Sequence, residues 1–371
     1  MRRANVSIAV VALLIASSSV FLSCDKEKRL ISPDQEEQES VYSGWLYVTQ
    51  DFKPGLFKID TETGDAVDSL DTPTRAFLVD ASQDGKYVAT SHFSGGTLLD
   101  YSGFTAIRSS ADLSELFSIP LLLTPVFVSD YGIMLGFSDY NVYTYSIPDF
   151  QVSSVDSIGR TGEHLLFEPD TLVYCLLIYG SGTTDSVTLA AYNFVRREIV
   201  DQWDICGPVG DLSCMIAAFD ISPDGKHLFI AGHAGIICYD LRTRTVDWQF
   251  DVAGSFVDVV SSPDGDRIYA LNGGFWSTPP HNGFIVVLNA SDGSHIAAES
   301  FDDIRGEYLL QATSLRMTPD GKNIFVAGAS QAIPFGCPGS VLVFDTEENH
   351  VKHVTWPELD HVPLFMAIGP K

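Results

Sequence analysis

The sequence predicts an all-β protein, a seven-bladed β-propeller built from four-stranded antiparallel blades. Three observations lead to this fold class. Short apolar runs separated by Gly, Pro, Asp and Asn continue along the chain, whereas amphipathic helical patterns are scarce after residue 23. A tight-turn motif recurs, and the spacing of its copies is typical of propeller blades. The 371 residues are 45% hydrophobic and include 23 Phe, which is ample for a large core.

The first 23 residues have the pattern of an export signal. Arg2 and Arg3 precede a short apolar segment over residues 6–20, which is too brief for a membrane span. The segment ends in "VFLSC", and residues 21–24 resemble a bacterial lipobox, although Phe21 stands where Leu is usual. The resemblance implies lipidation of Cys24, which would become the mature N-terminus. An ordinary signal peptide with a coincidental Cys is the alternative.

Residues 24–43 are expected to form a flexible tether, because they are charged and rich in Gln and Glu. Without residues 1–23 the chain carries 20 basic and 48 acidic side chains, a formal charge of −28. Such a surface repels nucleic acid and anionic lipid headgroups, so we expect no nucleic-acid partner and membrane contact only through the lipid on Cys24. We therefore expect an exported, membrane-anchored lipoprotein of the bacterial cell envelope, either periplasmic or on the cell surface.

The motif Ser222-Pro223-Asp224-Gly225 divides the domain that starts at residue 44. Ser at the first position, Pro with its preset φ at the second and Gly at the last predict a type I turn between two strands. Related tetrapeptides end at residues 85, 132, 171, 265 and 321, so neighbouring copies are 39 to 56 residues apart. Each interval holds four strand patterns, such as "HLFIAG" and "GIICYDL" after Gly225, as a propeller blade does.

The two ends of the domain complete the count. Residues 44–70 contain three strand patterns, and the C-terminal "VPLFMAIGPK" contains one more. We expect these N-terminal strands to pair with the C-terminal strand in one blade, which closes the ring and removes free sheet edges. Division at the turns then gives seven units: 44–85, 86–132, 133–170, 171–225, 226–265, 266–321 and 322–371.

The stretches "LYVTQ…GLFKIDTETGDAVDSL" and "SPDGKHLFIAG" resemble the YVTN-type β-propeller repeats of bacterial and archaeal surface and envelope proteins. They also share features with lactonase-like and WD-type propellers. The resemblance covers residues 44–371 and concerns turn and strand signals, so it indicates fold more than function. It implies that ligands bind at the central channel and on the face that carries the second-to-third and fourth-to-first strand connections.

Two long connections fall on that face in adjacent units. They are "NGGFWSTPPHNG" (272–283) and "GASQAIPFGCPGS" (328–340). Long connections are more often functional than short ones, and aromatic side chains are effective binding anchors. The candidate ligand-binding face therefore contains Phe275, Trp276, His281 and Phe335. Mutual packing of the two connections is the alternative.

Two histidines extend this face. His92 and His233 occupy equivalent positions at the ends of second strands, with a structural role as the alternative. A hydrolase of lactonase-like type would need such groups at the channel mouth, and its candidates are His92, His233, Arg160 and Glu163. The chain has no G-x-S-x-G elbow, H-E-x-x-H motif or phosphate-binding Gly loop, so no catalytic residue is assigned. The sequence predicts a monomeric module that binds or scaffolds a protein, peptide or glycan, with the hydrolase as alternative.

The cysteines beyond Cys24 indicate no cofactor. Cys206 and Cys214 bracket a loop-like stretch, so they form either a local disulfide or two free thiols. Cys175 and Cys238 lie inside strand patterns and are expected to be buried thiols. No cysteine shows zinc or haem-attachment spacing, so neither a metal site nor a cofactor is predicted.

Overall fold

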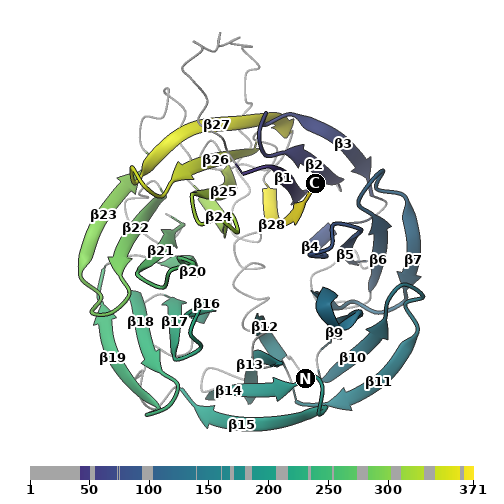
Figure 1. Cartoon of the computed structure of the whole chain (residues 1–371), viewed down its shortest axis with the longest axis horizontal. Coiled ribbons are helices and arrows are strands. Elements are labelled where there is room, and N and C mark those ends of the chain that lie inside the picture. Colours follow the sequence, from purple (N-terminus) through teal and green to yellow (C-terminus); the bar gives the residue numbers. More distant parts are fainter. Residues whose placement is uncertain are drawn as a thin grey trace, which may run out of the picture.

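The computed structural model describes residues 42–50, 55–72, 74, 76–93, 103–138, 140–159, 161–167, 171–179, 186–205, 216–232, 235–252, 255–273, 283–301, 311–329, 339–359 and 363–371. These residues form seven four-stranded antiparallel sheets arranged in a ring (Figure 1). The predicted seven-bladed all-β propeller is therefore confirmed. In this part of the chain the helical structure is one 3₁₀ turn, η1 (Ser129–Tyr131), and no helix is long and apolar enough to cross a membrane.

Within six of the blades the strands run in chain order from the axis outward (Figure 1). These blades are β4 (Ala76–Ala81), β5 (Tyr87–Phe93), β6 (Gly103–Ser109) and β7 (Glu115–Ile119); β8 (Thr124–Val128), β9 (Ile133–Phe137), β10 (Asn141–Ser146) and β11 (Val152–Ser157); β12 (Thr161–Phe167), β13 (Leu172–Tyr179), β14 (Ser186–Asn193) and β15 (Glu198–Asp204); β16 (Ile216–Ile221), β17 (His227–Gly232), β18 (Gly235–Asp240) and β19 (Thr245–Phe250); β20 (Phe256–Ser261), β21 (Arg267–Asn272), β22 (Phe284–Asn289) and β23 (His295–Ser300); β24 (Gln311–Met317), β25 (Asn323–Ala329), β26 (Gly339–Asp345) and β27 (His350–Leu359).

The seventh blade joins the two ends of the chain, as predicted. Its order is β28 (Pro363–Pro370), β1 (Gly44–Gln50), β2 (Gly55–Asp60) and β3 (Ala66–Asp71). The innermost strand is therefore C-terminal, and β1 pairs with it in a register that places Gly44 opposite Pro370. This pairing leaves neither β1 nor β28 as a free edge on that side, and it closes the ring.

The predicted units are out of phase with the sheets by one strand. Each recurring turn lies inside a blade, between its first and second strands, and Ser222–Gly225 joins β16 to β17. A unit cut at the turns therefore combines three strands of one blade with the first strand of the next. The number of units was correct, but their boundaries were not those of the sheets.

The first residue of the turn holds the hairpin together. The Ser222 hydroxyl accepts hydrogen bonds from the backbone N–H groups of Lys226 (3.1 Å) and His227 (2.9 Å). Gly225 donates its N–H to the Ser222 carbonyl at 2.8 Å and has a φ of 71°, which an L side chain rarely adopts. The hydroxyls of Ser82, Ser262 and Thr318 accept the equivalent backbone hydrogen bond in their own turns. This shared role explains why Ser or Thr recurs at the first position of the turn.

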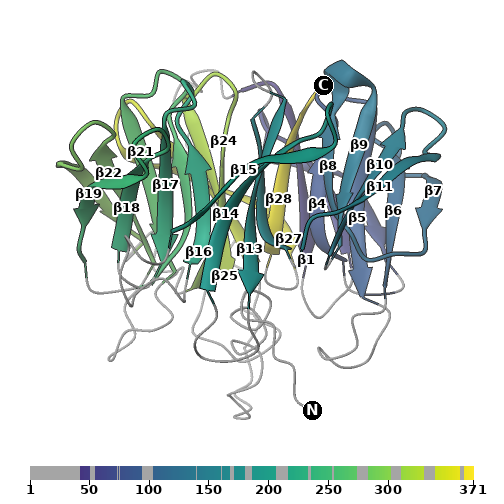
Figure 2. The ribbon, with the colours of Figure 1, turned by 90° about the horizontal axis from the view of Figure 1, so that it is seen from below.

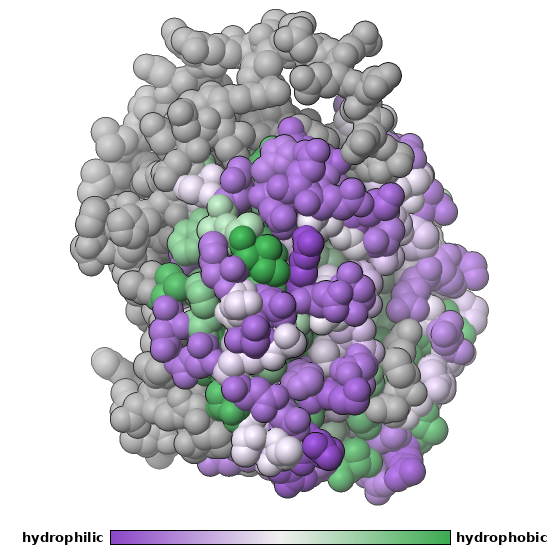
Figure 3. Space-filling view, turned by 60° about the vertical axis from the view of Figure 1, so that its left-hand side comes forward, coloured by the Kyte–Doolittle hydropathy of each residue, from purple (hydrophilic) through white to green (hydrophobic). Residues whose placement is uncertain are grey.

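The hydrophobic core is divided among the blade boundaries. Each of the seven buried clusters combines residues of two adjacent blades. The middle strands are consequently buried on both faces, as the first five residues of β18 are, whereas the outer strand β19 alternates between exposed and half-buried positions. On the side of the ring that Figure 3 brings forward, the surface of the described residues is largely hydrophilic, with scattered apolar side chains.

Candidate functional site

The two faces of the ring differ in the lengths of the connections they carry. We call the face with the first-to-second and third-to-fourth strand connections the turn face, and the opposite one the variable face. Every connection on the turn face that joins consecutive strands has four or five residues, such as residues 222–226 between β16 and β17 (Figure 2). Those on the variable face range from two residues (233–234) to eleven (273–283). Connections of more than five residues thus occur on one face only.

The predicted binding residues fall in the variable-face connections. Phe275, Trp276 and His281 lie between β21 and β22, His233 lies between β17 and β18, and Phe335 lies between β25 and β26. The described residues include none of these five. They also exclude Cys24, Arg160, Cys206 and Cys214. Glu163 is part of β12, but its side chain is not described. Three further long connections, over residues 94–102, 205–215 and 301–310, were not named as part of the candidate face.

The ends of the 273–283 connection are fixed to the blade. Gly273 donates its N–H to the Ser255 carbonyl at 3.2 Å, and the Gly283 carbonyl accepts from Phe301 at 3.0 Å. A Cβ on Gly283 would lie 3.1 Å from both the Asn272 carbonyl oxygen and the Phe301 ring, so the chain leaves the sheet through a close-packed site. The scaffold below this connection is therefore rigid, as binding loops require.

His92 is enclosed at the end of β5. Its side chain has no exposed surface, and its ring stacks on Phe104 with centroids 4.6 Å apart. Nε2 lies 2.8 Å from the Thr90 hydroxyl, and Nδ1 lies 3.5 Å from the Thr74 carbonyl. Burial lowers the pKa of His92 to about 4, so the imidazole is neutral at physiological pH. In this arrangement the ring serves the packing between β5 and β6.

The inner strands carry four charged side chains that the sequence analysis did not single out. They are Asp80 on β4, Asp220 on β16, Asp258 on β20 and Arg316 on β24. Each carboxylate accepts a backbone N–H from the inner strand of the following blade. The three donors are Phe127 to Asp80 (2.8 Å), Ser261 to Asp220 (2.6 Å) and Leu315 to Asp258 (2.9 Å). These groups therefore connect neighbouring blades around the axis.

Burial dominates the electrostatics of these carboxyl groups. It raises the pKa of Asp80 to about 6, even though the Phe127 N–H and the charge of Arg316 favour the ionised form. Burial also raises the pKa values of Asp220 and Asp258, the latter despite its ion pair with Arg316. A carboxyl group that titrates near neutrality is suited to acid–base chemistry. Here, however, each group already holds a backbone N–H of the next blade, which makes it a positioning element of the ring.

Two cysteines of the described chain are free and buried, which confirms the prediction for Cys175 and Cys238. Burial raises the pKa of both thiols, and that of Cys238 rises to about 12 with additional contributions from Asp247 and Asp240. Both are therefore protonated at neutral pH.

The geometry defines a β-propeller protein, and comparison with known proteins supports that class. No family model matches the sequence, and no curated protein sequence matches it. Among solved structures, a functionally unknown protein from Desulfotomaculum acetoxidans is similar, with a TM-score of 0.64 and 13% identity over 89% of this chain and 100% of that chain.

Two further structures share the fold. Dihydro-heme d1 dehydrogenase NirN, in complex with DHE, has a TM-score of 0.56 and 12% identity over 90% of this chain and 77% of its own. Kuenenia stuttgartiensis hydrazine synthase has a TM-score of 0.56 and 16% identity over 76% of this chain and 80% of its own. At these identities the likeness concerns the propeller fold alone, which hosts many unrelated activities.

Proposed function

We propose that this chain is a lipid-anchored propeller of the bacterial cell envelope that binds a protein, peptide or glycan as a monomer through its variable face. The observation that carries the proposal is that connections of more than five residues occur only on that face. Connections that only join strands stay short, as the four- and five-residue turns of the opposite face do. Connections of nine to eleven residues on rigid stems are the usual carriers of binding function.

The direction in which the chain enters the ring supports the same function. β1 begins at Gly44, opposite Pro370, and therefore at the turn face. A tether that runs from a lipidated Cys24 to this point would turn the turn face toward the membrane and direct the variable face away from it. The variable connections would then be accessible to a partner in the envelope.

Site-specific photo-crosslinking in native envelopes tests the binding face. A photoreactive amino acid at Trp276 or Phe335 should yield discrete adducts, because both positions lie in variable-face connections. Tyr131 is the matched control, since it is a 47% exposed aromatic residue on the turn face. Adducts that form equally from Tyr131, or from Tyr131 alone, would contradict the proposal. If the protein hydrolysed members of a lactone panel and no adduct formed, the result would also contradict the proposal and would favour the lactonase-like hydrolase.

The anchor is tested separately. Cys24→Ser should move the protein from the membrane fraction to the soluble fraction and abolish metabolic labelling with palmitate. A variant that stays in the membrane fraction would contradict lipid anchoring while leaving the binding face open to test.

A further inference from the structure

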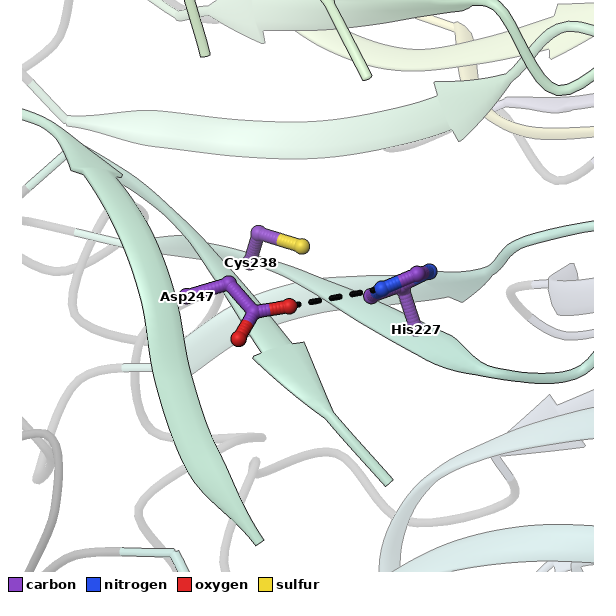
Figure 4. Close-up of side chains that lie close together, drawn as sticks. All are labelled: His227, Cys238 and Asp247. Carbon is purple, nitrogen blue, oxygen red and sulfur yellow. Dashed lines mark ion pairs between the residues drawn. The ribbon is translucent and has the colours of Figure 1, made fainter. Parts of the chain in front are cut away.

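Three potential metal ligands meet on one face of the β16–β19 blade (Figure 4). They are His227 on β17, Cys238 on β18 and Asp247 on β19, and their donor atoms all lie within 4.8 Å of one another. His227 Nε2 is 3.3 Å from Asp247 Oδ2. Two ligands bound about 2.0–2.1 Å from a tetrahedral ion are roughly 3.3 Å apart, so this pair already has the separation that such an ion requires.

The fold places these side chains with little freedom. The backbone of His227 is held at Ser222, because its N–H donates to the Ser222 hydroxyl and its carbonyl accepts from the Ser222 N–H, each at 2.9 Å. Asp247 is the extra residue of a β-bulge, because Val246 pairs with Tyr239 and Trp248 pairs with Cys238. Alternation from Val246, which shares a face with its partner Tyr239, directs Asp247 to the face of Cys238, and the bulge leaves Asp247 without a cross-strand partner of its own.

The other six blades serve as internal controls for this arrangement. The same bulge occurs between the third and fourth strands of every blade. If the fold itself required imidazole, thiol or carboxylate side chains at the three positions, they would recur there. None does: the equivalent residues are Trp45, Lys58 and Val67; Tyr87, Ile107 and Leu116; Ile133, Thr144 and Ser153; Leu172, Ala191 and Val200; Arg267, Val287 and Ile296; and Asn323, Val343 and Lys352.

We propose that His227, Cys238 and Asp247 bind a zinc-class divalent transition-metal ion, with a fourth coordination position open to solvent. Imidazole, thiolate and carboxylate are the ligand types that Zn²⁺ takes in proteins, and three protein ligands are typical of an open site. The site is accessible, because the side chains of His227 and Asp247 are 35% and 38% exposed while Cys238 forms its buried end. A bound ion would displace the thiol proton and join three adjacent strands.

Titration of the full-length protein with Co²⁺, followed by absorption spectroscopy, tests the site. We expect one equivalent of Co²⁺ to produce a thiolate-to-cobalt charge-transfer band that Zn²⁺ abolishes. Cys238→Val should remove the band. His227→Gln and Asp247→Asn, which alter partly exposed side chains, should retain the folded state and weaken Co²⁺ binding by at least about tenfold.

Two matched variants complete the design. Cys175→Val removes the other described buried thiol, and His295→Gln removes an exposed histidine of β23; both should leave the band unchanged. A band that persists in Cys238→Val, or its absence from the wild-type protein, would overturn the proposal. Equal weakening by His227→Gln and His295→Gln would also overturn it, because binding would then not depend on this trio.

Discussion

Arg316 on β24 and Asp258 on β20 form an ion pair across a blade boundary, with Nη1 3.2 Å from Oδ2. The same guanidinium donates from Nε to the Met366 carbonyl on β28 at 3.0 Å. One side chain thus links three consecutive blades, including the blade that closes the ring. The same Asp258 carboxylate also accepts a hydrogen bond from the backbone N–H of Leu315.

Arg316→Met should destabilise the protein by about 1–3 kcal/mol, because it leaves the largely buried Asp258 carboxylate without its counter-charge. The exposure of Arg316, whose side chain is 41% accessible, keeps the expected loss below that of a fully buried pair. Urea unfolding at pH 7 measures the change. The double variant with Asp258→Asn should recover part of the loss, and strict additivity of the two substitutions would argue against a coupled pair.

Asp80→Asn should stabilise the protein at pH 7.5 by about 2 kcal/mol. The pKa of Asp80 is raised to about 6 in the folded state, so folding takes up a proton between pH 4 and 6 and the carboxylate opposes folding above that window. The amide oxygen can still accept the Phe127 N–H. The advantage of the variant should therefore shrink as the pH falls below 6 and vanish well below 3.8, the ordinary pKa of Asp, where the carboxyl group is protonated in both states.

Asp84→Asn is the control of opposite sign in the same blade. Burial raises the pKa of Asp84, but its hydrogen bonds with Lys86 and Ser82 lower it by more. The pKa of Asp84 is therefore below its ordinary value. This substitution should cost stability at neutral pH, and the cost should shrink as the pH falls. If both variants shifted stability in the same direction at pH 7.5, the electrostatic explanation for Asp80 would be wrong.

His92 should make the fold sensitive to acid. Its pKa is lowered to about 4, so below pH 6.5 the unfolded chain binds a proton that the folded chain excludes, and stability falls as the pH falls toward 4. His92→Gln should abolish about 2–3 kcal/mol of the pH-dependent loss over this window. Thermal unfolding of both proteins at pH 7 and pH 4.5 measures it, and parallel loss in the two would refute the assignment.

Gly225→Ala should cost more than Gly132→Ala, although both glycines end an inner hairpin turn with positive φ, 71° and 61°. Strain in the left-handed region costs roughly 1–2 kcal/mol at either site. A Cβ on Gly225 would also meet the Phe167 ring of the preceding blade at 2.7 Å, whereas nothing lies within 4 Å of one on Gly132. We expect Gly225→Ala to lose at least about 1 kcal/mol more. Equal losses in chemical denaturation would exclude the inter-blade contact as the cause.

The turn motif made the fold predictable because its residues act locally. A Ser or Thr hydroxyl, a preset φ and a positive-φ Gly specify the hairpin without help from distant residues, so the copies also count the blades. The turns alone do not give the phase of the blades, because a turn does not show whether it lies within a sheet or between two sheets. The predicted pairing of the N-terminal strands with the C-terminal strand does give it, and the structure confirms this pairing. Only pairing across the chain, such as Gly44 with Pro370, sets that phase.

The candidate sites were predictable to different degrees. The lengths of the connections are visible in the sequence, so the variable face could be proposed from residues 272–283 and 328–340. The axial role of Asp80 depends on a backbone N–H of the next blade. His227, Cys238 and Asp247 follow no metal-ligand spacing, because they come from three strands and only the pairing of those strands brings them together.

The closing blade also determines how the domain carries mechanical load. A pull on the chain at Gly44 acts along β1, which is in register with β28 over Gly44–Gln50 and with β2 over Trp45–Gln50. Antiparallel ladder bonds lie perpendicular to their strands, so this force loads both ladders in shear and is shared among many bonds at once. The strand that closes the ring therefore also acts as a force-bearing clamp at the point where a tether would pull.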